Sequence, residues 1–236
     1  VCSELSEDLS KTNLGELKLD SFQDNSVQIK IKAASLNFPD LLMTQGKYQN
    51  RPNLPFALGM EGAGIVEKVG SGVSSFKEGD EVMFGGWGHG AIAESIILPE
   101  SMVSLKPKSL NFSEAASFKT AYLTAYVGLI RRGELKQRET LLVHGASGGV
   151  GMAAVQMGKL YGARVIASGT SDEKLKIVKT WGADEIINTG LEGSVSFREE
   201  VKELTNGKGA DVIYDPVGGD VFDESIRCIN WGGRLL

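Results

Sequence analysis

The sequence has few cysteines, no excess of basic residues and no long apolar run, and each shortage excludes a class of protein. Its two cysteines, Cys2 and Cys228, lie far apart and outside any CxxC motif, so they predict neither a disulfide framework nor a cysteine-rich zinc site. The net charge of −5 and the lack of a basic stripe argue against nucleic acid as a partner. No apolar run approaches the roughly 18 residues that a membrane span needs. Because residues 1–11 are polar and acidic, unlike a signal peptide, we expect a cytoplasmic protein that binds no membrane.

Glycine, by contrast, is abundant, and residues 1–112 predict a β-rich domain in which it marks turns. The chain has 30 glycines in 236 residues, about 13% against about 7% in average proteins. Val27, Ile29 and Ile31 alternate with polar residues, which is the pattern of a half-buried strand. Further short strands are expected at 63–69, 80–84, 91–98 and 102–105, separated by glycine-bearing turns.

Residues 113–236 predict a second domain of alternating strands and helices. Ser113 is a candidate N-cap, and a helical stretch runs on from it towards Gly133. Amphipathic helices then separate strands expected at 140–145, 164–168, 185–189, 211–215 and 233–236. This alternation predicts a doubly wound parallel sheet of the Rossmann type, covered on both faces. Because the chain ends inside the fifth strand, we expect this α/β domain to be truncated at its C-terminus.

The segment from His144 to Gly151, HGASGGVG, follows an apolar strand and opens an amphipathic helix, as a dinucleotide-binding fingerprint does. Its glycines allow close approach of the backbone to a pyrophosphate, and the helix N-terminus offers N–H groups to the phosphates. The first glycine of the G-x-G-x-x-G pattern is replaced by Ala146. The alternative is a tight strand-to-helix turn that binds nothing. The residues predicted to bind the cofactor here are Ala146, Ser147, Gly148, Gly149, Val150 and Gly151.

The end of the second strand of this domain predicts NADPH rather than NADH. An NAD enzyme usually has an acidic residue there for the ribose 2′-hydroxyl, and this chain has Ser168. Thr170, Ser171 and Lys174 follow, and hydroxyls and an ammonium group suit a 2′-phosphate. Alternatively, Ser171 caps the next helix and Lys174 is a solvated surface residue, and these roles are compatible with phosphate binding.

Five segments, in order and at the family's spacing, resemble the zinc-independent quinone oxidoreductase (zeta-crystallin-like) branch of the medium-chain dehydrogenase/reductase superfamily. They are AASLNFPDLLMTQGKY, LPFALGMEGAGIVEKVGSGVSSFKEGDEV, AASFKTAYLTAYVGL, LLVHGASGGVGMAAVQ and DVIYDPVGGDVF. The resemblance implies a GroES-like catalytic domain before the Rossmann domain, and a homodimer when the protein is full length. It also implies NADPH-dependent transfer of a hydride to a small-molecule quinone or α,β-unsaturated carbonyl. A 2-enoyl thioester reductase, or a cofactor-binding protein with a structural or regulatory role, is the alternative.

The same resemblance predicts that no metal is bound. Where zinc-dependent relatives have a Cys and a His ligand, this chain has Asn37 and Met60, and neither can replace a thiolate or an imidazole. The two histidines do not change this prediction, because His89 belongs to a glycine-rich turn and His144 to the cofactor loop.

The resemblance also assigns residues to the active site. Asn37 and Tyr48 correspond to polar residues beside the nicotinamide and the substrate, where hydrogen bonds must polarise the carbonyl. Thr124 corresponds to a contact of the nicotinamide carboxamide, and Val217 and Gly218 line the nicotinamide edge. Asn37 could instead be a turn residue before a proline, and Tyr48 a packed aromatic.

Overall fold

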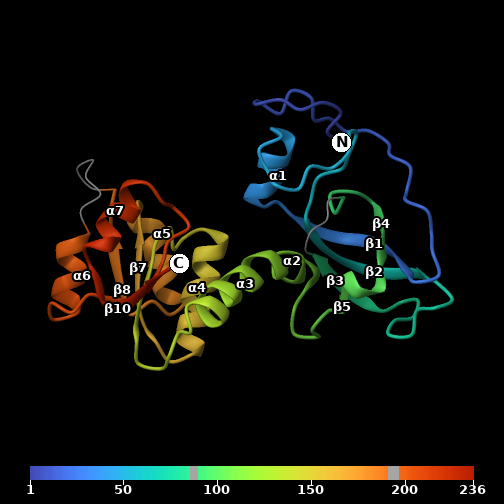
Figure 1. Cartoon of the computed structure of the whole chain (residues 1–236). Coiled ribbons are helices and arrows are strands. Elements are labelled where there is room, and N and C mark those ends of the chain that lie inside the picture. The colour runs from blue at the N-terminus through green and yellow to red at the C-terminus, as the bar shows by residue number, and fades with distance from the viewer. Residues whose placement is uncertain (86–89, 191–196) are drawn as a thin grey trace. The chain divides into compact units, whose positions relative to one another are not determined.

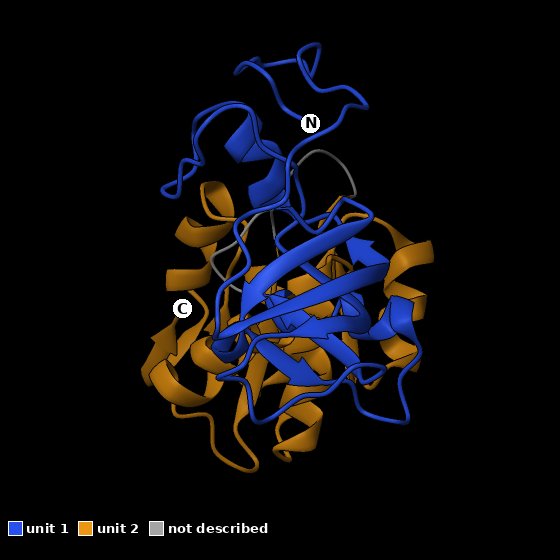
Figure 2. Ribbon diagram, turned by 90° about the vertical axis from the view of Figure 1, so that its right-hand side faces the viewer, with its two compact units in different colours: residues 1–120 blue, residues 121–236 orange. Residues whose placement is uncertain are grey.

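The computed structural model describes residues 1–85, 90–190 and 197–236. It divides the chain into two compact units, Val1–Thr120 and Ala121–Leu236, which are coloured separately in Figure 2. His89, predicted to lie in a glycine-rich turn, is outside the described residues. No helix within those residues combines the length and the apolar character needed to cross a membrane.

The first unit is built on a five-stranded antiparallel sheet in the order β4-β1-β2-β3-β5 (Figure 1). The alternating side chains Val27 and Ile29 are buried, as the sequence pattern predicts, and pack with residues of the neighbouring strands into one apolar cluster. The predicted strand at 91–98 begins only at Ser95. The strands are β1 (Ser26–Ser35), β2 (Glu61–Val69), β3 (Glu81–Gly85), β4 (Ser95–Pro99) and β5 (Val103–Leu105), and the short helix η1 (Glu100–Met102) joins the last two.

The helix α1 (Phe38–Thr44) is an addition to the predicted fold of this unit. Asn37 is its N-cap, with extended backbone, and a proline stands in the first turn where no N–H is needed. The carboxylate of Asp40 accepts from the backbone N–H of Asn37 at 2.8 Å and from that of Gly59 at 2.9 Å. These bonds fix the start of the helix against the loop before β2.

The predicted helical stretch after residue 113 is three helices, α2 (Phe112–Ala116), α3 (Lys119–Tyr126) and the π-helix η2 (Val127–Arg132). The prediction of Ser113 as N-cap is wrong, because the cap is Asn111. The side chain of Asn111 accepts from the backbone of Glu114 at 2.9 Å, and the Glu114 carboxylate accepts from the backbone of Asn111 at 2.8 Å. This reciprocal pair satisfies two N–H groups that the first turn leaves free. The helix α2 packs on β1, β2 and β3 of the first unit.

The second unit confirms the doubly wound prediction, with a parallel sheet in the order β10-β9-β6-β7-β8. Figure 1 shows helices on both sides of this sheet. The last strand starts at Ile229 rather than at 233, because α7 ends at Ile226. The strands are β6 (Thr140–Val143), β7 (Arg164–Gly169), β8 (Glu185–Asn188), β9 (Ala210–Tyr214) and β10 (Ile229–Leu235). The remaining helices are α4 (Gly149–Leu160), α5 (Asp172–Thr180), α6 (Arg198–Leu204) and α7 (Asp220–Ile226).

Both faces of this sheet are buried, as its near-continuous apolar strands require. Leu141 and Val143 pack on one face with α3 and α4, whereas Leu142 packs on the other with α6. The loops that follow β6, β7 and β9 all leave the sheet at the carboxyl ends of its strands, where α/β sheets of this kind bind ligands.

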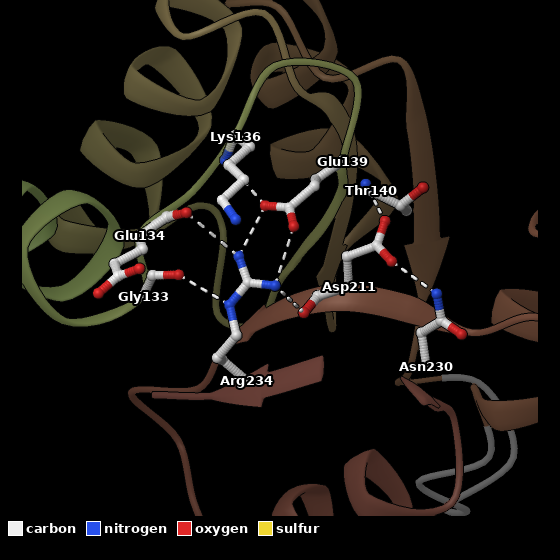
Figure 3. Close-up of polar contacts among 8 residues, drawn as sticks. All are labelled: Gly133, Glu134, Lys136, Glu139, Thr140, Asp211, Asn230 and Arg234. Carbon is white, nitrogen blue, oxygen red and sulfur yellow. Dashed lines mark hydrogen bonds and ion pairs between the residues drawn. The ribbon is translucent and has the colours of Figure 1, made fainter. Parts of the chain in front are cut away.

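Arg234 ties β10 to the opposite, amino-terminal edge of the sheet (Figure 3). Its guanidinium binds both carboxylate oxygens of Glu139, at 2.9 and 2.7 Å. The same group donates to the carbonyl oxygen of Gly133 at 2.8 Å. Asp211, which accepts from the backbone of Thr140 at 2.8 Å, holds β9 to β6 beside this ion pair.

Candidate functional site

The glycine-rich loop turns sharply between β6 and α4. Gly145 has φ +55°, a conformation that favours glycine. A Cβ atom on Gly151 would lie 2.4 Å from the carbonyl oxygen of Gly145 and 2.8 Å from the Cα of Ala146. The first turn of α4 therefore packs directly on the loop backbone, and Gly151 leaves room for this contact.

The outer side of the loop is open. A Cβ atom on Gly149 would meet no atom of the described residues within 4 Å, and one on Gly148 would meet only the carbonyl oxygen of Gly145 at 3.3 Å. Ser147 and both glycines are exposed, whereas Ala146 is fully buried and donates its N–H to the Ser168 carbonyl oxygen at 3.0 Å. The first N–H groups of a helix have no partner within it, so this exposed helix start is suited to an anion. The loop fits the pyrophosphate of a dinucleotide.

The loop after β9 lies beside the glycine-rich loop. A Cβ atom on Gly145 would be 3.2 Å from a methyl group of Val217, so the structure brings these two predicted parts of the site together. The carboxylate of Asp215 shapes the loop, since its Oδ1 accepts from the backbone of Val217 at 2.9 Å and of Gly218 at 3.0 Å. Its Oδ2 is buried and has no hydrogen-bond partner among the described residues. Val217 is 56% exposed, so its side chain is available to a ligand.

Ser168 occupies the end of β7, but its hydroxyl points into the core. The Oγ atom lies 2.6 Å from Nδ1 of His144, and Nε2 of His144 lies 3.0 Å from Oγ of Ser225. Ser225 donates its own proton to the Val221 carbonyl oxygen at 2.7 Å, so it accepts from Nε2. Nε2 therefore carries a hydrogen. Because burial lowers the pKa of His144 to about 4, the ring is neutral near pH 7, and Nδ1 accepts from Ser168. The hydroxyl of Ser168 is committed to this network, its carbonyl oxygen accepts from Ala146, and the residue is 2% exposed, so its role toward a cofactor stays a prediction.

The residues predicted to read a 2′-phosphate lie just beyond Ser168. Thr170 and Lys174 are exposed, and Ser171 is the N-cap of α5, with its hydroxyl 3.4 Å from the N–H of Lys174. The capping role that the sequence left open is therefore confirmed. Sequence reasoning missed Asp172, whose carboxylate accepts from the side chain of Asn188 at 2.7 Å. This acidic residue favours the helix start but opposes a phosphate beside Lys174.

Thr124 lies on the exposed side of α3, in the second unit. Ala121 and Ala125 of the same helix are buried and pack in the same apolar cluster as Ala146 of the glycine-rich loop. The role of Thr124 toward a nicotinamide remains a prediction.

In the first unit, Asn37 belongs to a network around the buried carboxylate of Glu61. The side-chain amide nitrogen of Asn37 donates to Oε1 of Glu61 at 3.0 Å and to Oγ of Ser35 at 3.1 Å. Ser35 donates to the same Oε1 at 2.7 Å, and Oε2 accepts from the backbone of Thr120 at 2.8 Å. Glu61 is 1% exposed. The sequence indicated that Asn37 could belong to a turn, and it is in fact a helix cap whose side chain is also anchored.

Two ionisable groups beside this network have shifted pKa values. Burial raises the pKa of Asp40, although the backbone N–H groups of Asn37 and Gly59 act in the opposite direction. Burial lowers the pKa of Lys119, whereas the nearby charge of Glu61 acts to raise it. The ammonium group of Lys119 donates to Oγ of Ser104 at 3.0 Å, so it supports β5.

Tyr48 is half-buried and packs against an apolar cluster that contains Met43, Phe56 and Met60. Met60, which stands at a position of a zinc-ligating His, is 8% exposed within this cluster. The amide of Asn37, at the other ligand position, is tied to Glu61 and Ser35. Across residues 1–85, 90–190 and 197–236, no three His, Cys, Asp or Glu side chains are grouped so that they could hold a metal. A thioether and a committed amide do not fit zinc.

Comparison with known proteins agrees with both units. The alcohol dehydrogenase GroES-like domain family matches residues 23–108, and the zinc-binding dehydrogenase family matches residues 149–236. The chain is 37% identical, over its whole length, to the quinone oxidoreductase-like protein 2 homolog of Nematostella vectensis, and spans 63% of that relative.

Two solved structures are similar to the chain. The quinone oxidoreductase of Escherichia coli complexed with NADPH is 35% identical, with a TM-score of 0.85, over 94% of this chain and 67% of that one. The CurK enoyl reductase is 30% identical, with a TM-score of 0.88, over 98% of this chain and 71% of that one. The fold and site define a medium-chain dehydrogenase/reductase. The chain belongs to the quinone oxidoreductase family of that superfamily.

Proposed function

We propose that the chain is an oxidoreductase that uses NADPH to reduce a quinone or an α,β-unsaturated carbonyl without zinc. The observation that carries this proposal is the glycine-rich loop at the start of α4. Gly148 and Gly149 leave its outer side open, and on its inner side a side chain at Gly151 would collide with the loop backbone. The NADPH in the similar E. coli quinone oxidoreductase supports the choice of cofactor. Lys174, Ser171 and Thr170 are the groups that we assign to its 2′-phosphate.

Bound NADPH would supply the hydride, and the chain would supply orientation and hydrogen bonds. The exposed N–H groups at the start of α4 would hold the pyrophosphate, and the end of β7, from Ser168 to the exposed Thr170, would face the adenosine half. Val217, Gly218 and Thr124 would orient the nicotinamide. Asn37 and Tyr48 would place their polar atoms beside the nicotinamide and the substrate carbonyl.

Zinc is not needed in this proposal, because hydrogen bonds replace the Lewis acid that a zinc-dependent relative uses. The residues at the two ligand positions support this view, since Met60 is buried among apolar side chains and Asn37 is bound to Glu61. Purified protein is expected to contain far less than one zinc per chain, and a chelator should leave its activity intact. Stoichiometric zinc that is required for turnover would contradict the proposal.

The test is steady-state oxidation of NADPH and of NADH with 1,4-benzoquinone, an aliphatic enone and a crotonyl thioester as acceptors. The proposal expects turnover with NADPH and the quinone or the enone. A strong preference for the crotonyl thioester would favour the second candidate, a 2-enoyl thioester reductase, which the similarity to the CurK enoyl reductase supports. Tight NADPH binding without turnover of any acceptor would instead indicate a cofactor-binding protein with a structural or regulatory role. That the full-length protein is a homodimer also stays a prediction, and light scattering of that protein would test it.

A further inference from the structure

The end of β8 supports the loop that follows β7, where we place the 2′-phosphate of the cofactor. The backbone N–H of Thr189 donates to the carbonyl oxygen of Gly169 at 2.8 Å. A Cβ atom on Gly190 would lie 2.6 Å from the carbonyl oxygen of Thr170 and 3.0 Å from its Cα. The two loops therefore pack backbone against backbone, and both belong to the second unit.

Asn188, the last residue of β8, joins this contact to the helix α5. Its side-chain nitrogen donates to Oδ1 of Asp172 at 2.7 Å, and its own Oδ1 accepts from the backbone N–H of Gly190 at 2.8 Å. An ionised carboxylate can only accept and a backbone N–H can only donate, so both neighbours require the same orientation of the amide. The carboxylate of Asp172 is therefore held toward β8.

This bond keeps the carboxylate of Asp172 off the ammonium group of Lys174. The two residues are the first and the third of α5, and side chains two positions apart on a helix do not face each other. No described residue forms an ion pair with Lys174, whereas Lys159 of α4 binds Asp184 at 2.8 Å. The ammonium group of Lys174 is therefore left for an anion.

We infer that Asn188 is a positioning residue that sets the preference for a 2′-phosphate over a 2′-hydroxyl, because it holds the carboxylate of Asp172 away from the phosphate. The inference rests on the proposed function, in which Lys174 binds that phosphate. Released from Asn188, the carboxylate of Asp172 would repel a phosphate and accept from a free ribose hydroxyl, as the acidic residue of an NAD enzyme does. The chain thus carries groups suited to either cofactor, and a neutral amide selects between them.

The test uses the adenosine half of the cofactor alone. The probes are 2′,5′-ADP and 5′-ADP, which differ only in the 2′-phosphate, and their affinities for the 236-residue chain are measured by titration calorimetry. Neither probe reaches a nicotinamide or substrate site, so the result is independent of turnover. The wild type should bind 2′,5′-ADP more tightly than 5′-ADP.

Asn188→Ala should weaken the binding of 2′,5′-ADP about fivefold without weakening that of 5′-ADP, because one released charge then repels the phosphate through solvent. Asp172→Asn should keep the preference, since the introduced amide oxygen can still accept from Asn188. In the Asp172→Asn background, Asn188→Ala should change the ratio of the two affinities by less than about twofold, because no charge remains to be released. The lost bond to Gly190 is common to both backgrounds and cancels.

Asn230→Ala is the matched control. The side chain of Asn230 makes the same two bonds as that of Asn188, donating to Asp211 at 2.6 Å and accepting from the backbone N–H of Trp231 at 2.8 Å. It lies at the amino-terminal edge of the same sheet, away from the loop that follows β7. Its loss should leave both affinities unchanged.

Equal weakening of both probes in Asn188→Ala would overturn the inference, because Asn188 would then only support the loop. A loss of preference as large in the Asp172→Asn background as in the wild type would overturn it as well. In either case a wild type that prefers 2′,5′-ADP leaves the proposed use of NADPH intact. A wild type that binds the two probes equally, or neither of them, would refute the phosphate contact of Lys174 and the inference with it.

Discussion

The buried imidazole of His144 should make the stability of the chain fall in mild acid. Its ring is 1% exposed and stacks against Phe197 with the ring centres 4.6 Å apart. Burial lowers the pKa of His144 from 6.5 to about 4, although the charge of Asp215 acts to raise it. Protonation would put a hydrogen on Nδ1, where Ser168 now donates, so it would also force that hydroxyl to turn round.

The size of the effect follows from the two pKa values. As the pH falls below 6.5 the unfolded chain takes up a proton that the folded chain does not accept until the pH is about 4. The unfolded state is therefore favoured progressively between these values, and above pH 7 His144 contributes no pH dependence. From pH 7 to pH 5 the free energy of unfolding should fall by about 2 kcal/mol through this residue alone.

The assay is urea unfolding of wild type and His144→Gln between pH 7.5 and 5. The introduced amide can still donate to Ser225 but does not titrate. The variant will be less stable overall, so the quantity that matters is the difference between the two pH slopes. This subtraction removes the contributions of groups that both proteins share. Equal slopes would show that His144 titrates near its ordinary pKa and that the buried neutral network is wrong.

Three further substitutions test other parts of the structure. Lys174→Ala should weaken NADPH binding about tenfold and leave NADH binding unchanged. Lys176 is an exposed lysine on the same helix, and Lys176→Ala should change the affinity for neither cofactor. An equal loss of affinity for both cofactors in Lys174→Ala would refute a phosphate contact. Gly151→Ala should lower the free energy of unfolding by about 2 kcal/mol or more, measured by heat or urea, because its Cβ would lie 2.4 Å from a backbone oxygen. Gly149→Ala is the control, since a Cβ there has open space, and it should cost less than about 1 kcal/mol. Arg234→Met should cost about 2 kcal/mol, since it leaves the 19%-exposed side chain of Glu139 without its bidentate partner. Arg198→Met breaks a 2.8 Å pair with a 70%-exposed glutamate and a 4.0 Å pair with Glu224, and should cost clearly less. Similar values for the two arginine variants would contradict the role given to the Arg234 ion pair.

The architecture could be predicted because strand and helix periods are local properties of the sequence. The alternation after residue 113 specified a parallel sheet, and the structure has one, with all five strands near their expected places. The helix α1 is not predicted because it is only seven residues long and lies in a region whose sequence pattern predicts mainly strands. The spacing of Asn37 and Asp40, an N-cap with an acidic residue three positions later, was the signal that could have found it.

The polar networks could not be predicted in the same way, because they join residues that are far apart in the chain. Asn37 and Glu61 are 24 positions apart, and His144 and Ser225 are 81 apart. Ser168 shows the consequence. Its position at the end of β7 was evident from the sequence, but the direction of its hydroxyl depends on a histidine and a helix that only the fold brings near.

The same kind of contact occurs in both units, namely a carboxylate that accepts hydrogen bonds from backbone N–H groups. Asp40 accepts from two, Glu61 from one, and Asp215 from two. A backbone N–H has a fixed direction and no alternative proton state, so such a carboxylate cannot rotate without losing a bond. At Asp40 each of the two oxygens accepts from a backbone N–H, so an amide of equal size would place a donor against a donor at one of its two atoms. Asp40→Asn should therefore change the geometry at the start of α1, even where the fold survives.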